Sequence, residues 1–533
     1  MKSILYLIIL SVSIAQDYYE YKIIPEDNGW GTMFGTHVSS NNFQFATNNK
    51  TVDGNYEVQF YANSNGGWEL TNSINIEYLN AVVHQQLEDD FYILSMSGNA
   101  NSTPPQNFHP GKLKIYANYD GDWTLIQIIN NPDADNYMQF GQGFFRNNEL
   151  MIINSKHREE DIVKLYVYRY VENNWVVEFS YEINQEYIGS TNLYIDENQI
   201  IYGDYSADLT DENSYEGRVL IFDRINDIWQ LNTTLTSNPM IIEGGFGFSI
   251  SYYDGTLFVG AYNEINKTGA VYVFNKIDGV WTQVQRLLAS DFSPNSRFGY
   301  NIKVNENSLL INAPFNNDAG PGSGSVYIFN ENNENQWTES RKICSSDLAM
   351  MDEFGGSIGF VNDYIVASAP MKNNMSGAIY IYHLADTMLH SNFATYPVTG
   401  NAPLTLSFND LSQGYPTVWQ WDFDSDGIID SEEQYPEHTY EFSADYTITL
   451  TVTNDEETST FTKENYISVS GGLAYGDLNG DTTVDVIDIV IMVDVIMGEV
   501  EPTVTQIEAA DMNNSGTIDI IDIVLVVNEI LGG

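Results

Sequence analysis

Two short acidic stretches near the end of the chain carry side chains well suited to binding metal ions. In the first, oxygen-bearing residues occupy positions 1, 3, 5, 7, 9 and 12 of a loop: Asp477, Asn479, Asp481, Thr483, Asp485 and Asp488. The second repeats this spacing 34 residues later: Asp511, Asn513, Ser515, Thr517, Asp519 and Asp522. Oxygen ligands at this spacing can surround calcium, with a backbone carbonyl at position 7. The sequence therefore predicts two calcium ions here.

The charge of this region supports the same interpretation. Residues 473–533 hold 12 Asp and Glu and no Lys or Arg. A module so unbalanced should fold poorly without a cation. The alternative, two acidic turns without a metal, leaves the imbalance unexplained.

An apolar run follows each loop, over residues 487–497 and 521–531. We expect position 12 of each loop to open a helix. The first run is apolar around almost its whole circumference, so its helix needs a second surface besides its own module. The duplication thus predicts a pair of helices, each fixed at its entry by calcium, with a face left for a partner.

The loops and helices of residues 471–533 resemble the type I dockerin domain. That resemblance implies docking onto cohesin modules of scaffold proteins. Two departures stand out. Position 6 of the first loop is Thr482, where the family usually has glycine because the turn favours positive φ. Positions 10 and 11 are Val486-Ile487 and Ile520-Ile521, where the family often has Ser-Thr. They suggest a more apolar interface, with a cohesin-like module or a neighbouring domain of the same chain.

The chain upstream of residue 386 carries an internal repeat of about 54 residues. Its tryptophans are separated by 55, 52, 54, 52 and 56 residues: Trp68, Trp123, Trp175, Trp229, Trp281 and Trp337. A Phe-Gly pair follows four of them by 17 residues: Phe140-Gly141, Phe246-Gly247, Phe298-Gly299 and Phe354-Gly355. Each unit predicts four short strands, as in a blade of a β-propeller. The count gives seven blades, the last completed by residues 18–24 as its outermost strand, which removes a free edge.

These units resemble the FG-GAP repeats of integrin alpha-type propellers, most specifically in the last three. In that family several blades carry a calcium loop between the second and third strands. The matching stretches here, 260–269 and 312–324, lack its carboxylate spacing, so we expect no calcium in the blades. The ordinary role of each Phe-Gly and Trp is packing between blades.

Residues 386–470 form a third kind of module. The alternation over 446–452 predicts a strand with one buried face, as in an immunoglobulin-like sandwich. Its W-x-W-D-F strand and the later P-x-H-x-Y run resemble the PKD domain. A loop in this module has further EF-hand-like spacing and is a tentative third calcium site: Asp422, Asp424, Asp426, Asp430 and Glu433. A plain polar hairpin is the alternative.

Composition limits the location and the partners of the chain. It carries 73 Asp and Glu against 21 Lys and Arg, a formal net charge of −52, and such a surface excludes nucleic acid as a partner. Residues 1–15 have the pattern of a secretory signal peptide. No later stretch is long and apolar enough to span a bilayer. Cys344 is the only cysteine, so no internal disulfide is possible.

The sequence thus predicts a mainly β protein that is secreted or held at the cell surface. Its parts are a signal peptide (1–15), a seven-bladed β-propeller (16–385), a PKD-like β-sandwich (386–470) and a small all-α calcium-binding dockerin module (471–533). No catalytic constellation is recognisable, so we expect a binding or adhesion protein rather than an enzyme, with the propeller recognising a glycan or surface protein. One alternative is a polysaccharide-degrading component of a dockerin-assembled complex, with paired carboxylates in a cleft. Another is a purely structural surface-layer protein.

Overall fold

The computed structural model describes most of the chain from residue 20 onward. The described residues are 20–25, 34–50, 56–64, 67–76, 82–96, 111–133, 138–157, 162–184, 192–210, 214–384, 388–471, 475–480, 483–513 and 515–531. The predicted signal peptide, residues 1–15, lies outside them. The chain divides into two compact units, one made mainly of residues up to 386 and the other mainly of residues after it.

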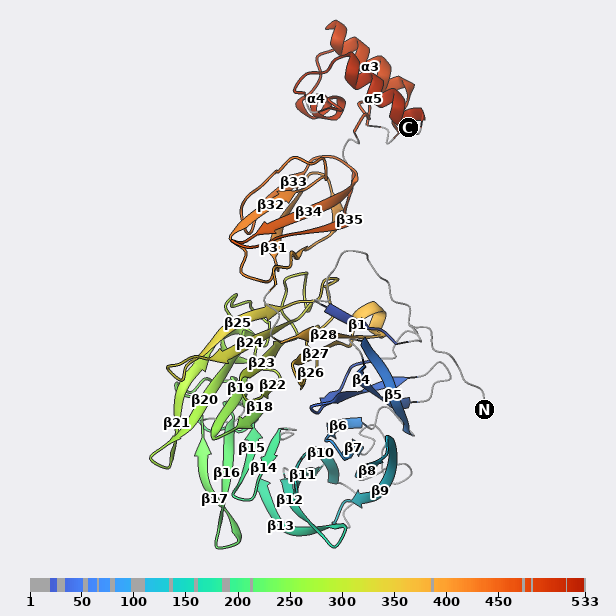
Figure 1. The fold of residues 1–533 in the computed structure, drawn as a ribbon. Helices are drawn as coiled ribbons and strands as arrows, with labels where there is room; N and C mark the ends of the chain where they lie inside the picture. Colours follow the sequence, from blue (N-terminus) through green and yellow to red (C-terminus); the bar gives the residue numbers. More distant parts are fainter. Residues whose placement is uncertain are drawn as a thin grey trace, which may run out of the picture. The chain divides into compact units, whose positions relative to one another are not determined.

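Strands of the first unit, within the described residues, form seven antiparallel sheets of four strands each (Figure 1). Three of them are built from β2 (Val38–Ser40), β3 (Gln44–Lys50), β4 (Tyr56–Ser64) and β5 (Gly67–Ile76); β6 (Val82–Leu87), β7 (Phe91–Met96), β8 (Lys112–Tyr119) and β9 (Asp122–Asn130); and β10 (Met138–Asn147), β11 (Leu150–His157), β12 (Ile162–Val171) and β13 (Asn174–Asn184). Each sheet keeps its strands in chain order because neighbouring strands are joined directly along the chain.

Three of the remaining sheets of the first unit follow the same plan, and the last differs in its outer strand. Three contain β14 (Leu193–Ile195), β15 (Gln199–Asp204), β16 (Arg218–Ile225) and β17 (Ile228–Leu235); β18 (Phe246–Tyr253), β19 (Thr256–Ala261), β20 (Ala270–Ile277) and β21 (Val280–Leu287); and β22 (Ile302–Val304), β23 (Ser308–Ala313), β24 (Ser325–Glu331) and β25 (Trp337–Ile343). The last contains β26 (Ile358–Val361), β27 (Tyr364–Ala369), β28 (Ala378–His383) and β1 (Glu20–Ile23). Single helical turns, α1 (Glu264–Lys267) and α2 (Lys372–Met375), lie between the second and third strands of their sheets.

The last sheet is completed from the other end of the unit. Strand β1 is its outer strand and pairs with β28, from Glu20 opposite Tyr382 to Ile23 opposite Ile379. This confirms the predicted pairing over residues 20–23; residues 18 and 19 lie outside the described residues. A sheet assembled from both ends of the unit ties those ends together.

The first strands of the seven sheets contact one another in chain order. Strand β2 contacts β6, β6 contacts β10, β10 contacts β14, β14 contacts β18, β18 contacts β22 and β22 contacts β26. Strand β26 then contacts β2 again, so the row of contacts returns to its start.

The Phe-Gly repeats lie at the junctions between sheets. The five phenylalanines are fully buried: Phe34, Phe140, Phe246, Phe298 and Phe354. A glycine that precedes the third strand of one sheet bridges the phenylalanine of the next, as Gly377 does with Phe34. A Cβ on Gly377 would lie 2.0 Å from the Phe34 carbonyl oxygen, and its φ of +85° also favours glycine. The predicted packing role of the repeats is therefore confirmed.

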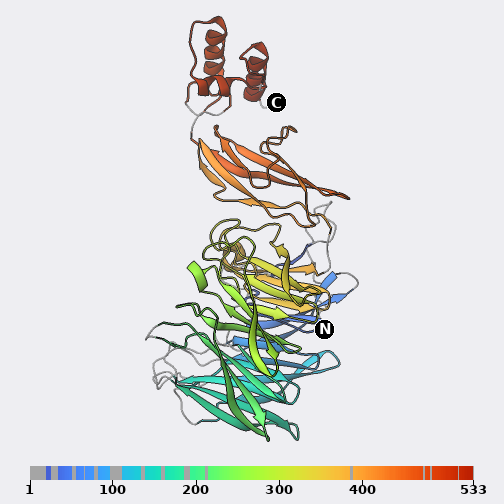
Figure 2. The ribbon, with the colours of Figure 1, turned by 90° about the vertical axis from the view of Figure 1, so that its left-hand side faces the viewer.

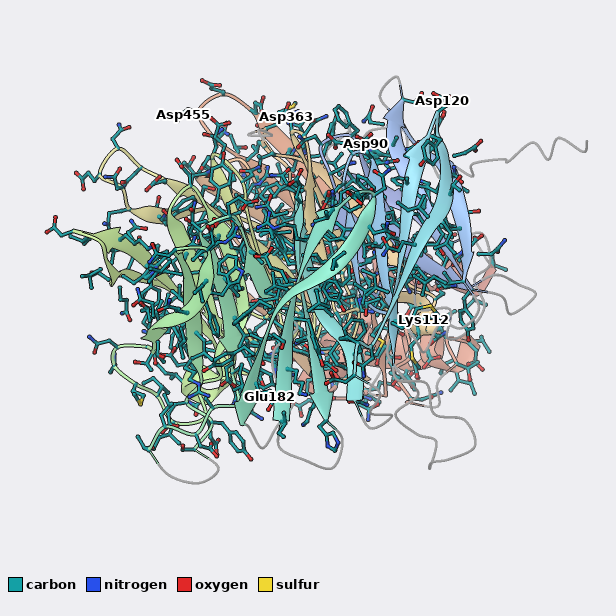
Figure 3. The ribbon with its side chains drawn as sticks, turned by 90° about the horizontal axis from the view of Figure 1, so that it is seen from below. Asp90, Lys112, Asp120, Glu182, Asp363 and Asp455 are labelled. Atoms are coloured by element: carbon teal, nitrogen blue, oxygen red, sulfur yellow. The ribbon has the colours of Figure 1, made fainter. Side chains whose placement is uncertain are left out.

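The repeated tryptophans contribute to the same packing. Trp68, Trp175, Trp229, Trp281 and Trp337 are all buried. The ring of Trp337 on β25 lies 5.0 Å from that of Phe258 on β19, in the preceding sheet. Several acidic side chains lie on the outside instead: Asp90, Asp120 and Asp363 are in exposed turns at strand ends (Figure 3).

Residues 388–471 fold as a β-sandwich. One sheet has the order β29 (Phe393–Thr395), β31 (Leu404–Asp410) and β33 (Glu437–Tyr440). The other has the order β30 (Thr399–Asn401), β35 (Thr458–Ser470), β34 (Asp445–Thr453) and β32 (Val418–Asp422). Every second residue of β34 is buried, as its alternation predicts. The core between the sheets includes Phe393, Phe408, Trp421, Ile448 and Leu450.

The C-terminal part is helical. It contains α3 (Val486–Met497), α4 (Val504–Ala510) and α5 (Ile520–Leu531). Helices α3 and α5 run beside each other, as both views show (Figures 1 and 2). Their shared core is small: Leu478, Met492, Ala510 and Val526. Within the described residues, no helix is both long and apolar enough to cross a membrane.

Candidate functional sites: acidic loops and an aromatic cluster

The helices of the C-terminal part begin at loop position 10, two residues earlier than predicted from position 12. Asp485 at position 9 caps α3, because its side chain accepts a hydrogen bond from the Ile487 amide at 2.7 Å. Asp488 completes a capping box by accepting from the Asp485 amide at 2.9 Å. The sequence interpretation started each helix at loop position 12 and missed the capping residue at position 9.

In the first loop, the residues at positions 1 and 12 are both fully buried. Asp477 accepts from the Gly480 amide at 2.7 Å, and Asp488 accepts from the amides of Leu478 and Asn479 at 2.8 and 3.2 Å. The carboxylate of position 12 thereby holds the start of the loop against the start of the helix. Asn479 and Thr483 are exposed, and Asp481 lies outside the described residues.

The second loop has the same geometry. Asp511 accepts from the amides of Ser515 and Gly516 at 3.0 and 2.6 Å. Asp522, fully buried, accepts from the amides of Asn513 and Asp519 at 3.3 and 2.8 Å. Of the remaining predicted ligands, Asp519 is half-buried and Thr517 is exposed.

These loops bury four carboxylates without any basic side chain in the module. Asp477, Asp488 and Asp522 are fully buried, Asp511 is 7% exposed, and residues 473–533 contain no Lys or Arg. Burying an ionised carboxylate is costly unless it is paired. The donors present are carboxylate, amide and hydroxyl oxygens, which calcium prefers. The residues therefore fit a hard divalent cation.

Above the loops, the two helices expose an apolar face that repeats with the same 34-residue spacing. Positions 10 and 11 are exposed in both copies, with Val486 65%, Ile487 51%, Ile520 68% and Ile521 53% exposed. The exposed face continues with Val490 and Met497 on α3 and with Val524 and Leu531 on α5. We call these eight residues the helical apolar face. Buried core residues on the opposite side, Met492 and Val526, show that each helix has one face packed and one free.

The predicted third metal loop lies at the end of β32. One carboxylate oxygen from each of Asp422, Asp424 and Asp426 lies within 4.8 Å of the others. The other two predicted ligands do not join them. Asp430 accepts from the Phe423 amide at 2.6 Å, and Glu433 uses its backbone carbonyl to accept from the Trp421 indole at 2.8 Å. No helix follows the loop, so the EF-hand spacing fails beyond position 5.

Connections between strands of the first unit also bury carboxylates, but these have basic partners. Glu264 on α1 is 1% exposed and pairs with Arg286 and with the Tyr272 hydroxyl. On α2, Lys372 forms an ion pair of 2.6 Å with Asp352, and both are 5% exposed. A basic side chain thus lies beside each of these buried carboxylates.

Asp291, in the connection between β21 and β22, shows how such a partner changes the pKa of a buried carboxyl. Burial alone would raise the pKa of Asp291, but the Lys342 ammonium, 2.8 Å away, and hydrogen bonds from Asn316 and Tyr327 bring that pKa below its usual value. The carboxylate is therefore held in its charged form by the protein itself.

Sequence reasoning missed a cluster of aromatic side chains in the first unit. Phe248 contacts Tyr205, Tyr262 and Tyr300, with ring centroids 5.1, 4.2 and 4.8 Å away. Phe315 lies 6.1 Å from Tyr300. We call these five residues the aromatic cluster. All are partly exposed, and burial raises the pKa of each of its three tyrosines, which keeps their hydroxyls neutral.

Arg297 joins this cluster and gives it a positive charge. Its guanidinium lies 4.5 Å from the Phe315 ring and 5.7 Å from the Tyr262 ring. The cluster spans three successive sheets because its members occupy repeated positions. Phe248 and Tyr300 directly follow Phe-Gly pairs, while Tyr205, Tyr262 and Phe315 come one or two residues after a second strand ends. Alignment of the repeats at these positions is the sequence signal that could have found it.

Comparisons with protein families agree with these three regions. The FG-GAP repeat matches residues 281–329 and 337–382, the PKD domain residues 394–469 and the dockerin type I domain residues 475–531. The chain thus carries FG-GAP repeats, a PKD domain and a dockerin type I domain, in that order. Dockerin type I domains bind calcium, and the domain implies a cohesin partner. Dockerin and FG-GAP domains are typical of extracellular or surface proteins that assemble into complexes.

Matches to individual proteins cover a smaller part of the chain. Integrin alpha-11 of Mus musculus is 26% identical over 196 residues, 34% of this chain and 16% of its own length. Integrin alpha-11 of Homo sapiens is 26% identical over 148 residues, 25% of this chain and 12% of its own length. The chain therefore matches only a small part of these relatives.

Solved structures give only weak likenesses. Sqt1 of Saccharomyces cerevisiae has a TM-score of 0.40 and 10% identity, covering 68% of this chain and 98% of its own. A putative 6-phosphogluconolactonase from Bacteroides uniformis has a TM-score of 0.39 and 13% identity, covering 58% and 84%. Scores at this level carry no argument about fold or function.

Proposed function

We propose that this protein is an extracellular binding protein that docks through its C-terminal part and recognises its target through its first unit. The observation that carries the docking role is the helical apolar face, repeated over two loops that bury carboxylates without basic partners. Calcium in the loops would hold the helix entries in place, and the helices would offer the face to a cohesin-like module. The apolar residues at positions 10 and 11 favour a partner with an apolar complementary surface.

In this proposal the first unit is a seven-bladed β-propeller. Support comes from the seven sheets of four strands, from the contacts of β2 through β26 that return to their start, and from the completion of the last sheet by β1. A ring closed in this way has no unpaired edge between its first and last sheets.

The aromatic cluster supports the recognition role of the propeller. Partly exposed aromatic rings offer flat apolar surfaces, while tyrosine hydroxyls and Arg297 supply hydrogen-bond donors. A sugar ring has the matching chemistry, with apolar C–H faces and hydroxyl groups at its edge. A glycan is therefore the proposed target, and a surface protein is the competing outcome of the test.

Docking is tested with the full-length chain against a panel of cohesin modules. Val490→Asp and Val524→Asp place a charge in the exposed face without touching the core, so we expect each to weaken binding in calcium. Glu508→Gln on α4 removes an exposed charge outside the face and serves as the control. Equal binding by the two aspartate variants and the control would refute this docking surface.

Recognition is tested on a glycan array with the same protein, assayed also for released sugars. Tyr262→Ala and Tyr300→Ala should reduce glycan binding strongly. Tyr253→Ala, an exposed tyrosine of the same sheet outside the cluster, should leave binding unchanged. Binding to surface proteins alone, or release of sugars, would replace the glycan-binding proposal with one of the alternatives.

A further inference from the structure

The loop after β32 in the sandwich brings three carboxylates to one place. It opens at Asp422 and is closed at its base by a bridge between Trp421 and Ser431, with the Trp421 amide donating to the Ser431 carbonyl at 2.8 Å. One carboxylate oxygen from each of Asp422, Asp424 and Asp426 lies within 4.8 Å of the other two. The base is anchored in the core, because Trp421 and Phe423 are buried.

The carboxylate of Asp422 is buried, and only one of its two oxygens accepts a hydrogen bond. It is 8% exposed, and its Oδ2 accepts from the Gly427 amide at 3.0 Å. Its Oδ1 is buried and has no hydrogen-bond partner. A buried, unpaired carboxylate oxygen carries a desolvation cost that a native structure normally offsets with a partner.

No basic side chain offsets the charge of this group. Across the described residues, no ion pair joins Asp422, Asp424 or Asp426 to lysine, arginine or histidine. The lysine of the same sheet, Lys463 on β35, donates instead to the Phe393 carbonyl at 2.6 Å. Three like charges this close repel one another and call for a counter-ion.

We propose that Asp422, Asp424 and Asp426 bind one calcium ion in this loop. Calcium accepts oxygen ligands at about 2.3–2.6 Å, so ligands on opposite sides of one ion lie up to about 5 Å apart. The observed spacing of the oxygens falls within this limit. The unpaired Oδ1 of Asp422 gains its partner, and the exposed Asp424 and Asp426 complete the protein's share of the shell with water.

A hydrogen bond to the sheet restrains the middle of this loop. The Ser425 hydroxyl donates to the Thr447 carbonyl on β34 at 3.0 Å, which holds the loop against the sheet. With three side-chain ligands, the site should resemble weak extracellular calcium sites, with a dissociation constant of about 10⁻⁴–10⁻³ M. It would stiffen the sandwich independently of the docking helices and of the proposed function.

The experiment counts bound calcium on the full-length chain by equilibrium dialysis. Asp424→Asn with Asp426→Asn should bind one ion fewer per chain than wild type. The matched control, Asp455→Asn with Glu456→Gln, removes the same charge from an exposed turn of the same sandwich and should bind the wild-type number. Both variants keep the C-terminal loops, so the ions bound there contribute equally to both counts.

A second measurement uses terbium in place of calcium, excited through tryptophan. Trp421 adjoins Asp422, whereas residues 473–533 contain no tryptophan. Sensitised emission should appear with wild type and with the control, and be lost in the double variant. Equal ion counts in all three proteins, or emission that survives in the double variant, would overturn the proposal.

Discussion

The first unit and the C-terminal part bury carboxylates in opposite ways. In the first unit, Glu264 pairs with Arg286, and Asp352 with Lys372. In the C-terminal part, Asp477, Asp488 and Asp522 are fully buried where the sequence provides no basic residue. The unit of sheets therefore carries its own counter-charges, while the helical part must take one from solution. From this difference we expect calcium removal to leave the first unit unchanged and to weaken docking.

The largest expected effect comes from removing calcium from the full-length protein. With chelator, peptides covering α3 and α5 should lose protection against hydrogen exchange by more than about tenfold, because the helix entries lose their counter-ion. Peptides covering β20 and β28 should not change. Hydrogen-exchange mass spectrometry with calcium and with EDTA measures both regions in one sample. Equal protection of the helices in EDTA would mean that their acidity has another cause.

The second-largest expected effect comes from removing a basic partner in the first unit. Lys372→Met leaves Asp352 buried without its partner and should destabilise the first unit by about 3–5 kcal/mol. Calorimetric melting measures the change, and added calcium should not reverse it. The double variant Lys372→Met with Asp352→Asn should recover much of the loss because no unpaired charge remains. A full rescue of the single variant by calcium would show that this loop can also use a metal.

The sequence predicted these regions unequally well. The Phe-Gly and tryptophan spacings located the sheets, because a packing contact that recurs at every junction repeats in sequence. The pairing of β1 with β28 followed from the same count. The basic partners could not be predicted this way, since Lys372 and Asp352 are brought together only by the fold and follow no spacing.

For the candidate sites, spacing predicted which side chains lie together where those residues are close in sequence. It grouped Asp422, Asp424 and Asp426, whose carboxylate oxygens lie together in the structure. It also assigned Asp430 and Glu433, which accept hydrogen bonds from Phe423 and Trp421 instead. It placed the helix starts two residues late, because a capping Asp is polar and reads as loop. The aromatic cluster was missed, since each member looks like one more strand residue until successive sheets bring them together.

One buried carboxylate of the first unit does not have a basic partner. Glu216 is 1% exposed and has hydroxyl and amide partners instead of a basic one: Ser214, Thr210 and the Leu209 amide. Burial alone would raise the pKa of Glu216, yet these hydrogen bonds lower it to about 2.

Because the folded pKa lies below the unfolded value, Glu216 stabilises the fold above about pH 4.5, and this contribution is lost as pH falls towards 2. Glu216→Gln should remove about 2–3 kcal/mol of the pH dependence between pH 7 and pH 3. Denaturant unfolding at the two pH values gives the difference. The same pH dependence in variant and wild type would assign the acid sensitivity to other groups.

The smallest expected effect separates the two calcium loops of the C-terminal part. The first loop offers four aspartates: Asp477, Asp481, Asp485 and Asp488. The second offers three, with the neutral Ser515 at position 5, but its Gly516 takes a φ of +83° that suits glycine, while the first loop has Thr482 at that position. Charge favours the first loop and backbone fit the second. An added carboxylate beside a divalent ion slightly outweighs the cost of a β-branched residue in the turn, which is about 1–3 kcal/mol.

We therefore expect the chain that retains only the first loop, Asp511→Ala, to bind calcium a few-fold more tightly than the chain that retains only the second, Asp477→Ala. A few-fold change corresponds to under about 1 kcal/mol. Calorimetric titration of the two full-length variants measures the order, and the sandwich loop is common to both. Each variant should also bind a cohesin partner more weakly than wild type, because one helix entry loses its counter-ion. Tighter binding by Asp477→Ala would mean that backbone fit at position 6, rather than charge, sets the affinity of these loops.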